Sequence, residues 1–386
     1  MSLDKATKPI VHIATDEKFI DAAYEIYETA FPSQNKFLIL LASRKVKIKH
    51  ISENKNYEYF FLEDDYIDKI AKSLGQAKYV VFHGMSSHQA EIVLDIEFSC
   101  KLIWTVFGGE VYSNPKIIGK KNYGKKTFRN FLNYGFYLKK YFRTGYYRLC
   151  KWSGNPYKIR LAALKKMDYA SVLYKEEMEL FKQLGVIKKD LKWIKFTYYP
   201  LEIIIEKNND AIRQSNILLG NSASYSNNHL EVFDILKNLE IGERKIITPL
   251  SYGDKEYADE ISSIGHKIFP KNFSPLRQFL PLKEYQKITH RCGIVIMNHY
   301  RQQAVGNVLD MLYCGAKVYL SKQNTLYHYL ERIGCYVYCI EDDMKPNNTQ
   351  IFKLLSEEQV KLNRKLLSEE ISLNHICKEL KQTINP

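Results

Sequence analysis

The chain has 386 residues, 45% of them hydrophobic and 26% charged. At about 100 to 200 residues per domain, this length predicts two domains, and the composition excludes a disordered or fibrous protein. Seven cysteines, an odd number, favour a reducing cytosolic compartment. No apolar run approaches the roughly 18 residues that a membrane-spanning helix needs, so we expect a soluble or peripherally bound protein.

The N-terminal third alternates short apolar runs with stretches of helical periodicity. Alternation of this kind predicts a parallel sheet covered by helices. Strands are expected at residues 10–14, 36–42, 57–62, 78–83 and 101–107. Helices are expected at residues 17–31, 64–74 and 87–98.

A second alternating series follows a junction near residues 195–212. Upstream of it we expect a helix over 171–184 and strand with linker over 191–210. Later strands are expected at 217–219, 245–250, 267–269, 293–298, 317–321 and 335–340. We therefore predict an α/β protein with two Rossmann-like domains facing a cleft, because open α/β sheets bind ligands at the carboxyl ends of their strands. The expected boundaries are 1–200, 212–355 and a helical tail over 356–386.

The net charge of +14 comes from one segment. Residues 111–167 contain fifteen Lys and Arg residues and no Asp or Glu, leaving 42 basic and 43 acidic residues elsewhere. On a helical wheel of residues 126–151 the apolar side chains fall on one side and the cations on the other, which predicts an amphipathic helix. Gly135 and Gly145 weaken that prediction. The candidate membrane or acceptor contacts are Lys126, Arg129, Tyr137, Lys140, Arg148 and Lys151.

Three hypotheses account for this basic segment: a solvated helix face, a nucleic-acid surface, or a patch on anionic lipid headgroups. A solvated face normally mixes both signs of charge, and this segment does not. No helix-turn-helix, zinc-finger, RRM or KH signature accompanies the charge, so nucleic acid is not the expected partner. We therefore expect this part of the N-terminal domain to meet an anionic membrane surface or a polyanionic lipid-linked substrate.

A polar loop of small residues, 220–229, follows the strand expected at 217–219. Asn228, with Glu231 three residues later, predicts an N-cap for the next helix. Backbone N–H groups of the loop would then gather at a helix N-terminus, which suits a phosphate group. The loop is neither a P-loop nor a GxGxxG motif, and an ordinary strand-to-helix turn is the alternative.

A second polar cluster, residues 298–303, follows another apolar strand of the same domain. Arg301 could hold a phosphate through two hydrogen bonds, and Gln303 or Asn307 could bind ribose or sugar hydroxyls. A capped helix start with solvated side chains is the alternative. Because both polar clusters follow strands of one predicted sheet, we expect them to form one site.

Five motifs over about 100 residues occur in a specific order. They are Leu218–Ser222, Ser226–His229, Pro249–Gly253, Leu282–Tyr285 and Arg301–Asn307. With these motifs the chain resembles family 56 glycosyltransferases, the group of 4-α-L-fucosyltransferases and TDP-N-acetylfucosamine:lipid II N-acetylfucosaminyltransferases. A thinner likeness covers 82–84 and 104–112, where Phe107 and Glu110 replace the Trp and Asp of the family's Trp-Gly-x-Asp-Leu-Tyr.

The resemblance implies a GT-B glycosyltransferase with a nucleotide-sugar donor in its C-terminal domain. It also implies a polyprenyl-diphosphate-linked saccharide acceptor, at the cytoplasmic face of the bacterial inner membrane, in surface polysaccharide synthesis. We expect no cofactor and no metal ligands, because a helix N-terminus and Arg301 can neutralise the diphosphate, and the acidic runs 63–65 and 341–343 lack a DxD pattern. The expected donor-binding residues are Gly220, Asn221, Ser222, Ser226, Asn227, Tyr252, Gly253, Glu284, Tyr285, Arg301, Gln302, Gln303, Gly306, Asn307 and Ser321.

Sugar transfer needs a group that takes the proton of the acceptor hydroxyl. Glu110, after a strand and a glycine-rich loop of the N-terminal domain, is the leading candidate, and a capping or solvated carboxylate is the alternative. His83 is the second candidate, although a histidine at a strand end is more often structural. Two other functions remain open: a GT-B transferase with a UDP- or GDP-sugar donor, and a basic nucleic-acid-binding protein.

Overall fold

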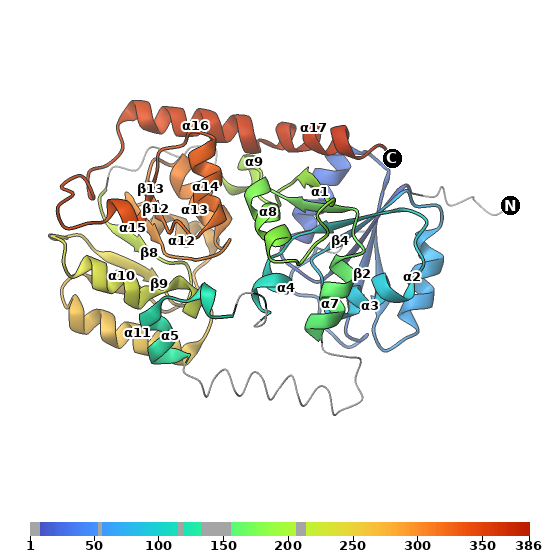
Figure 1. The fold of residues 1–386 in the computed structure, drawn as a ribbon, viewed down its shortest axis with the longest axis horizontal. Coiled ribbons are helices and arrows are strands. Elements are labelled where there is room, and N and C mark those ends of the chain that lie inside the picture. Colours follow the sequence, from blue (N-terminus) through green and yellow to red (C-terminus); the bar gives the residue numbers. More distant parts are fainter. Residues whose placement is uncertain (1–7, 53–55, 115–116, 118, 133–155, 206–213) are drawn as a thin grey trace. The chain divides into compact units, whose positions relative to one another are not determined.

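The computed structural model describes residues 8–52, 56–114, 117, 119–132, 156–205 and 214–386 (Figure 1). The described residues form two compact units. Unit 1 draws on Met1–Ile117, Thr144–Ile203 and Ile371–Pro386, and unit 2 on Ile118–Arg143 and Ile204–Glu370. Each unit contains a parallel sheet with helices, as the alternating pattern predicts.

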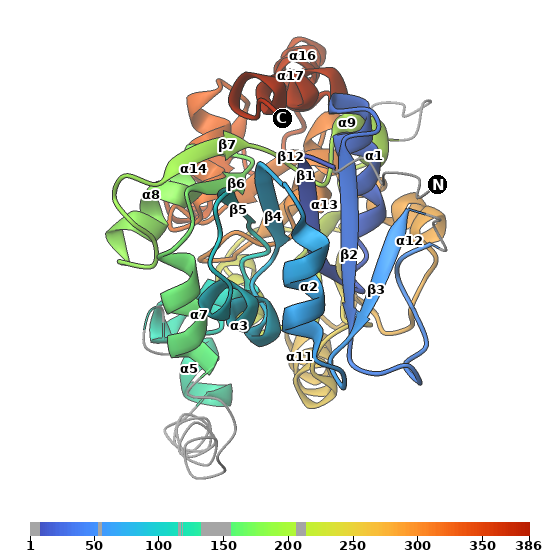
Figure 2. The same cartoon turned by 90° about the vertical axis from the view of Figure 1, so that its right-hand side faces the viewer.

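The described part of unit 1 contains a seven-stranded parallel sheet in the order β3-β2-β1-β4-β5-β6-β7, which Figure 2 shows with its strands following one another across the view. Its strands are β1 (Ile10–Thr15), β2 (Asn35–Leu41), β3 (Tyr57–Phe61), β4 (Tyr79–His83), β5 (Lys101–Thr105), β6 (Tyr169–Val172) and β7 (Lys192–Lys195). The central strands are buried over nearly their whole length, because a parallel sheet is covered on both faces. This burial explains the continuous apolar runs in the sequence.

The helices of unit 1 pack their apolar stripes against this sheet. They are α1 (Ile20–Ala30), α2 (Tyr66–Leu74), α3 (Ser87–Asp95), α4 (Gly109–Tyr112), α7 (Pro156–Leu164), α8 (Lys175–Gln183) and α17 (Leu373–Thr383), with α9 (Leu201–Ile204) at the sequence boundary between the units. One core cluster joins Ile10, Ile26 and Phe37 to Ile376 and Leu380.

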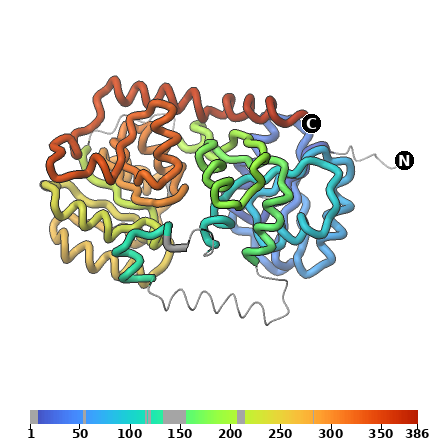
Figure 3. The backbone as a smooth tube through the Cα atoms, viewed as in Figure 1, coloured from blue at the N-terminus to red at the C-terminus, as the bar shows by residue number. Residues whose placement is uncertain are grey.

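The C-terminal tail is helical, as predicted, but its last helix returns to unit 1. Helix α16 (Glu357–Ile371) is followed by Ser372, whose hydroxyl accepts a hydrogen bond from His375 N and caps α17. Helix α17 packs on α1 and β7, so the red end of the chain lies beside its blue beginning in Figure 3. The buried side chains Ile376 and Leu380 hold it there, which differs from the separate tail expected over 356–386.

Unit 2 contains, among its described residues, six parallel strands in the order β10-β9-β8-β11-β12-β13. They are β8 (Ile217–Leu219), β9 (Ile246–Pro249), β10 (Phe273–Leu276), β11 (Ile294–Met297), β12 (Lys317–Leu320) and β13 (Val337–Cys339). The other helices of the unit are α5 (Lys125–Phe131), α10 (His229–Leu236), α11 (Lys255–Ile268), α12 (Leu282–Thr289), α13 (Val305–Tyr313), α14 (Thr325–Arg332) and α15 (Ile340–Asp343). The first strand of the unit lies in the middle, which is the Rossmann order.

One predicted strand and the start of one predicted helix differ from the structure. The strand expected at 267–269 is wrong, since α11 continues to Ile268 and the third strand of unit 2 is β10. The helix expected from residue 171 begins only at Lys175, because Tyr169–Val172 forms the short strand β6. In both places a run of three or four residues is too short for its periodicity to distinguish strand from helix.

Part of the basic segment belongs to unit 2, whereas the expected location was the N-terminal domain. The N-cap residue of α5 is Gly124, which has no side chain to cap the helix, so Glu231 of α10 supplies the acceptor. The Glu231 carboxylate accepts hydrogen bonds from Lys126 N at 2.7 Å, Thr127 N at 2.9 Å and Thr127 Oγ1 at 2.6 Å. Phe131 packs on Tyr257 with ring centroids 4.7 Å apart.

The described part of the predicted amphipathic helix ends early. Helix α5 stops at Phe131, and Leu132 is its C-cap. Of the predicted membrane contacts, Lys126 and Arg129 lie on α5, whereas Tyr137, Lys140, Arg148 and Lys151 lie outside the described residues. In the described ranges, no helix has the length and apolar character that crossing a bilayer requires.

We predict that Glu231→Ala loosens α5 from α10, because three donors lose a charged acceptor. The free energy of unfolding of unit 2 should fall by about 1 to 2 kcal/mol, as measured by urea denaturation. Amide hydrogen exchange at residues 125–131 should accelerate with it.

The matched control for this prediction is Asp234→Ala, also on α10. Asp234 makes only exposed ion pairs, with Lys126 at 2.6 Å and Lys237 at 2.5 Å, so its loss should cost less than about 1 kcal/mol. Equal exchange protection of α5 in both variants would contradict the capping role of Glu231.

Candidate functional site

The order of strands in unit 2 places the ends of β8 and β11 side by side. These two strands pair in parallel, with Leu219 opposite Ile296. Gly220 follows β8 and Asn298 follows β11, so both predicted polar clusters lie at the same edge of the sheet. The chain reverses direction of winding between these strands, and open α/β sheets bind ligands at such a position. The two polar clusters therefore lie next to each other, and their role as one donor site stays a prediction.

Direct hydrogen bonds join the two clusters. Gln303 Nε2 donates to Asn221 Oδ1 at 3.0 Å, and Ser226 Oγ donates to Gln303 Oε1 at 2.6 Å. Gln303 and Asn221 are half-buried, whereas Ser226 is buried. Gln303 therefore ties the loop after β8 to the segment after β11, and its position depends on both.

Asn227 holds the loop after β8 from the inside. Its Oδ1 accepts from Asn221 N at 2.9 Å and from His299 Nε2 at 2.8 Å, and its Nδ2 donates to Ser222 O at 3.0 Å. Gly220 has φ +68°, and a Cβ there would lie 2.7 Å from Asn227 Oδ1. Asn227 is fully buried, so its contacts are with the protein and its part in the site is to shape the loop.

Asn228 is the N-cap residue of α10, as predicted, but it does not cap the helix with its side chain. Its backbone adopts a left-handed conformation with φ +51°. The side chain instead accepts from Gly124 N at 2.8 Å and donates to Asn298 O at 2.9 Å. Asn228 and His229 are fully buried, so the start of α10 is covered by protein.

The open helix start at this edge belongs to α13. Residues 301–307 are all half-buried, and Ala304, with φ +56°, turns the chain into the helix. The first backbone N–H groups of a helix have no acceptor within it, and they carry partial positive charge. Gly306 and Asn307 lie in this first turn, which makes it the part of the edge best suited to an anion.

Arg301 stands directly before this helix start. Its Nη1 donates to Gln302 O at 3.1 Å, which fixes one end of the guanidinium on the local backbone. Its charge also acts on Tyr123, whose pKa is raised by burial and lowered in part by Arg301. Sequence reasoning missed Tyr123, because nothing local in the basic segment shows that it lies near a residue 178 positions away.

The segment after β9 supports the loop through its backbone. Ala223 N donates to Tyr252 O at 2.7 Å, and Asp254 N donates to Ala223 O at 2.8 Å. Gly253 has φ +121°, and a Cβ there would lie 2.4 Å from Ala223 O, so this close approach requires glycine. The Tyr252 side chain is 79% exposed. Tyr252 and Gly253, both predicted as donor contacts, thus support the loop through their backbone, and Tyr252 also presents an exposed ring.

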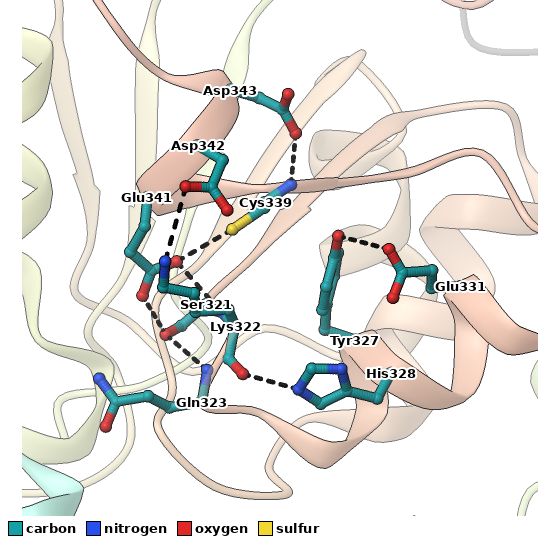
Figure 4. Close-up of polar contacts among 10 residues, drawn as sticks. All are labelled: Ser321, Lys322, Gln323, Tyr327, His328, Glu331, Cys339, Glu341, Asp342 and Asp343. Atoms are coloured by element: carbon teal, nitrogen blue, oxygen red, sulfur yellow. Dashed lines mark hydrogen bonds and ion pairs between the residues drawn. The ribbon is translucent and has the colours of Figure 1, made fainter.

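A further polar cluster lies at the ends of β12 and β13 (Figure 4). Ser321 Oγ donates to Glu341 Oε1 at 2.5 Å, and Lys322 N donates to Glu341 Oε2 at 3.0 Å. Because β12 neighbours β11, this cluster extends the same edge of the sheet. Ser321 was predicted, whereas Glu341 was interpreted as part of a helix or loop start, and it does lie in α15.

Two predicted donor residues lie on α12. Glu284 is exposed, while Tyr285 is half-buried with its hydroxyl inside the protein. Burial raises the pKa of Tyr285, and the nearby Cys292 and Asp310 raise it further. The ring of Tyr285 therefore points toward α13 and the start of β11, and Glu284 is the member of the pair that faces solvent.

Glu110 lies in α4 of unit 1, just after β5. Its Oε1 accepts from Trp104 Nε1 at 2.9 Å and from Phe107 N at 3.0 Å, and the residue is 6% exposed. Burial raises the pKa of its carboxyl, while these hydrogen bonds oppose the rise. A raised pKa makes the Glu110 carboxylate a stronger base. The same carboxylate also fixes the loop after β5 through its hydrogen bonds, which is a structural role. The catalytic role of Glu110 therefore stays a prediction.

His83 lies inside a chain of buried polar groups in unit 1. The side-chain NH₂ group of Asn35 donates hydrogen bonds to three acceptors, which fixes the orientation of the amide. The Asn35 Oδ1 atom therefore accepts the hydrogen bond from His12 Nε2, at 3.2 Å. His12 Nδ1 then accepts from His83 Nε2 at 3.0 Å, and His83 Nδ1 accepts from the Tyr198 hydroxyl at 2.8 Å. Both nitrogens of His83 have partners and its side chain has no exposed surface. These contacts favour the structural alternative over catalysis.

Comparisons with known proteins agree with this arrangement. The family model described as 4-alpha-L-fucosyltransferase glycosyl transferase group 56 matches residues 157–365. Similar solved structures are Anabaena HepE in complex with UDP and glucose (TM-score 0.64, 9% identity), the lipopolysaccharide outer core galactosyltransferase WaaB (0.63, 10%) and sucrose-phosphate synthase from Thermosynechococcus elongatus (0.60, 10%). Each match covers 97% of this chain and 98% of the other. These are GT-B glycosyltransferases, which confirms the predicted fold class.

We predict that acid destabilises the protein through its buried histidines. Burial lowers the pKa of His83 to about 3 and that of His12 well below its usual value. Below about pH 6.5 these histidines take up protons in the unfolded chain but not in the folded one, so stability falls as the pH falls. Each such histidine should contribute a slope of about 1.4 kcal/mol per pH unit below about pH 6.5.

The measurement is urea denaturation of unit 1 between pH 7.5 and 4.5. His83→Gln should reduce the slope by the share of one histidine, while His88→Gln, whose side chain is 43% exposed, should leave it unchanged. A slope that is the same in all three proteins would contradict this prediction.

Proposed function

The chain belongs to glycosyltransferase family 56, and from this premise we propose that it transfers a deoxy- or amino-sugar, such as fucose or N-acetylfucosamine. The proposed donor is a nucleotide-sugar. The proposed acceptor is a polyprenyl-diphosphate-linked saccharide at the cytoplasmic face of the bacterial inner membrane, in surface polysaccharide synthesis. The observation that carries the proposal is the polar edge of unit 2, where Arg301 and the open start of α13 lie next to the loop after β8.

This edge suits a nucleoside diphosphate. Arg301 and the first N–H groups of α13 supply positive charge for two phosphate groups. Gln303, Asn307 and Glu341 supply donors and acceptors for ribose and sugar hydroxyls, and the buried Ser321 hydroxyl holds the Glu341 carboxylate in place. The HepE structure is described as a complex with UDP and glucose, which supports a nucleotide-sugar as the partner class. The same positive groups would stabilise the departing diphosphate without a metal ion.

In the proposed reaction the acceptor hydroxyl attacks C1 of the sugar and the bond from C1 to the diphosphate oxygen breaks. The hydroxyl proton goes to a base, for which Glu110 is our candidate, and the nucleoside diphosphate leaves with its charge held by Arg301 and α13. A carboxylate whose pKa is raised by burial accepts that proton more readily than an exposed one.

The described basic residues give limited support to a membrane-bound acceptor. Lys125 and Arg129 are exposed on α5, whereas Lys126 is paired with Asp234. The apolar side of α5 packs on unit 2 through Phe131 and is not free to enter lipid. Attachment through α5 would therefore be electrostatic.

Thermal shift with the nucleotides that nucleotide-sugars release tests the donor assignment, because a ligand that binds only the folded state raises the melting temperature. We expect dTDP to give the largest shift among dTDP, UDP, GDP and CMP. A larger shift with UDP or GDP would favour the alternative donor class. No shift with any of the four would contradict the donor site itself.

We predict that Arg301→Ala weakens binding of the selected nucleoside diphosphate by about 1.5 to 3 kcal/mol, since a charge-assisted hydrogen bond is lost. Isothermal titration calorimetry measures the change. Arg291→Ala, an exposed arginine before β11, is the control and should bind normally. Unchanged affinity in a folded Arg301→Ala protein would remove Arg301 from the site.

We predict that Glu110→Gln lowers turnover by about 10² to 10⁴ with little change in donor affinity, because the amide keeps Oε1 as an acceptor but is no longer a base. In the unmodified enzyme the rate should rise with pH as Glu110 loses its proton, and the variant should lack this limb. Glu97→Gln, exposed in the same unit, is the control. Near-normal turnover at saturating donor and acceptor would show that Glu110 is not the base.

We predict that Lys125→Gln with Arg129→Gln weakens binding to anionic vesicles by about 30-fold at low salt, from roughly 1 kcal/mol for each cation near the surface. Flotation on vesicles with and without anionic lipid measures it. Lys237→Gln, at the C-cap of α10, is the control. If the double variant floats like the unmodified protein, α5 does not contact the membrane.

A further inference from the structure

A second cluster of reactive side chains lies at the opposite edge of the unit 2 sheet. His290 is the C-cap of α12, and Asp310 and Cys314 lie four residues apart on α13, so they share one face of that helix. The cluster precedes β11 and β12, whereas the donor residues follow these strands. A four-residue strand separates the two edges by roughly 13 Å, at about 3.3 Å per residue.

The three side chains converge on one point. His290 Nε2 lies 3.1 Å from Asp310 Oδ2 and 3.8 Å from Cys314 Sγ, and that sulfur lies 3.6 Å from Asp310 Oδ1. For tetrahedral Zn²⁺ with usual bond lengths, the expected separations are about 3.4 Å for N to O, and about 3.6 Å for N to S and for O to S. The Asp310 carboxylate presents Oδ2 to the imidazole and Oδ1 to the sulfur, and with one ligand atom taken from each residue all three atoms lie within 4.8 Å of one another. Small side-chain rotations would bring these atoms to the separations of three ligands around one ion.

The chemistry of the three donors narrows the choice of ion. A thiolate, an imidazole and a carboxylate together are typical of zinc, whereas Mg²⁺ and Ca²⁺ prefer oxygen alone. Cys314 has no exposed surface and Asp310 is 8% exposed, while the His290 side chain is 22% exposed. One side of the cluster is thus open to solvent, where water can supply a fourth ligand.

Two further features distinguish this cluster from a simple ion pair. The carboxylate and the sulfur approach the same nitrogen of His290, whereas a hydrogen-bonded relay would use both ring nitrogens. The C-termini of α12 and α13 also meet here, because His290 and Cys314 are their C-caps. Helix C-termini carry partial negative charge, which favours a cation beside them.

We propose that His290, Asp310 and Cys314 bind one Zn²⁺ ion that ties the end of α12 to the end of α13. The ion stabilises the fold and takes no part in the transfer reaction, since it lies at the edge away from Arg301. Because the first turns of α12 and α13 carry Glu284 and Asn307, the ion holds together two helices that begin near the candidate donor site. This inference does not depend on the proposed function.

Cobalt binding to tag-free, chelator-treated protein tests the proposal. We expect one Co²⁺ per chain, with the near-ultraviolet absorption of a thiolate ligand and the visible bands of a tetrahedral site. Zn²⁺ should displace the Co²⁺ and raise the melting temperature. Absence of the thiolate absorption in the unmodified protein would overturn the proposal, and that measurement needs no variant.

Variants then assign the ligands. Cys314→Ser should abolish the thiolate absorption, and His290→Gln or Asp310→Asn should weaken cobalt binding by more than the roughly 10- to 100-fold typical of losing an outer partner. Cys335→Ser is the matched control, since Cys335 is also buried and also precedes a strand of this sheet. Retention of the absorption in Cys314→Ser, or its loss in Cys335→Ser, would overturn the assignment.

Discussion

The pairing of β8 with β11 is the constraint on which the candidate site depends. Parallel strands end at the same edge, so the pairing brings Gly220 and Asn298 together although 78 positions separate them in the sequence. Each strand end must then satisfy its polar groups, and Asn227, Asn228 and Gln303 do so by bonding across the two segments. The interior amides fix the loops, and the half-buried residues at Arg301 and the start of α13 are where we propose that a ligand binds.

The sequence predicted those parts of the fold and site that depend on local pattern. The strand 217–219 and the two polar clusters could be located because buried strands form apolar runs that end in small polar residues. The packing of α5 could not be predicted from local pattern, because it depends on a hydrogen bond from Thr127 to Glu231, 104 positions away. The contacts of the Asn228 side chain could not be predicted either, since its left-handed backbone follows from tertiary contacts and not from its neighbours in the sequence.

Residue type alone also could not distinguish residues of a functional site from structural residues of the core. His83 is the last residue of β4 and Glu110 follows β5, and both were candidates for the same proton transfer. In the structure His83 completes a neutral chain from Tyr198 to Asn35, in which every ring nitrogen has one partner. Glu110 keeps one carboxylate oxygen on the loop after β5, and its pKa is raised by burial. The number and kind of hydrogen-bond partners distinguish a catalytic candidate from a structural residue. These partners come from distant segments of the chain, so the sequence alone does not show them.

Helix α13 connects the chemistry of the two edges of unit 2. Its first turn offers backbone N–H groups and partial positive charge beside Arg301, where a diphosphate is proposed to bind. Its last residue, Cys314, lies at the negative end, beside His290 and Asp310. One helix dipole thus favours an anion at one edge and a cation at the other. A zinc ion at the end of α13 would restrain the helix whose beginning meets the donor, so metal loss should lower thermal stability without removing any donor-binding group.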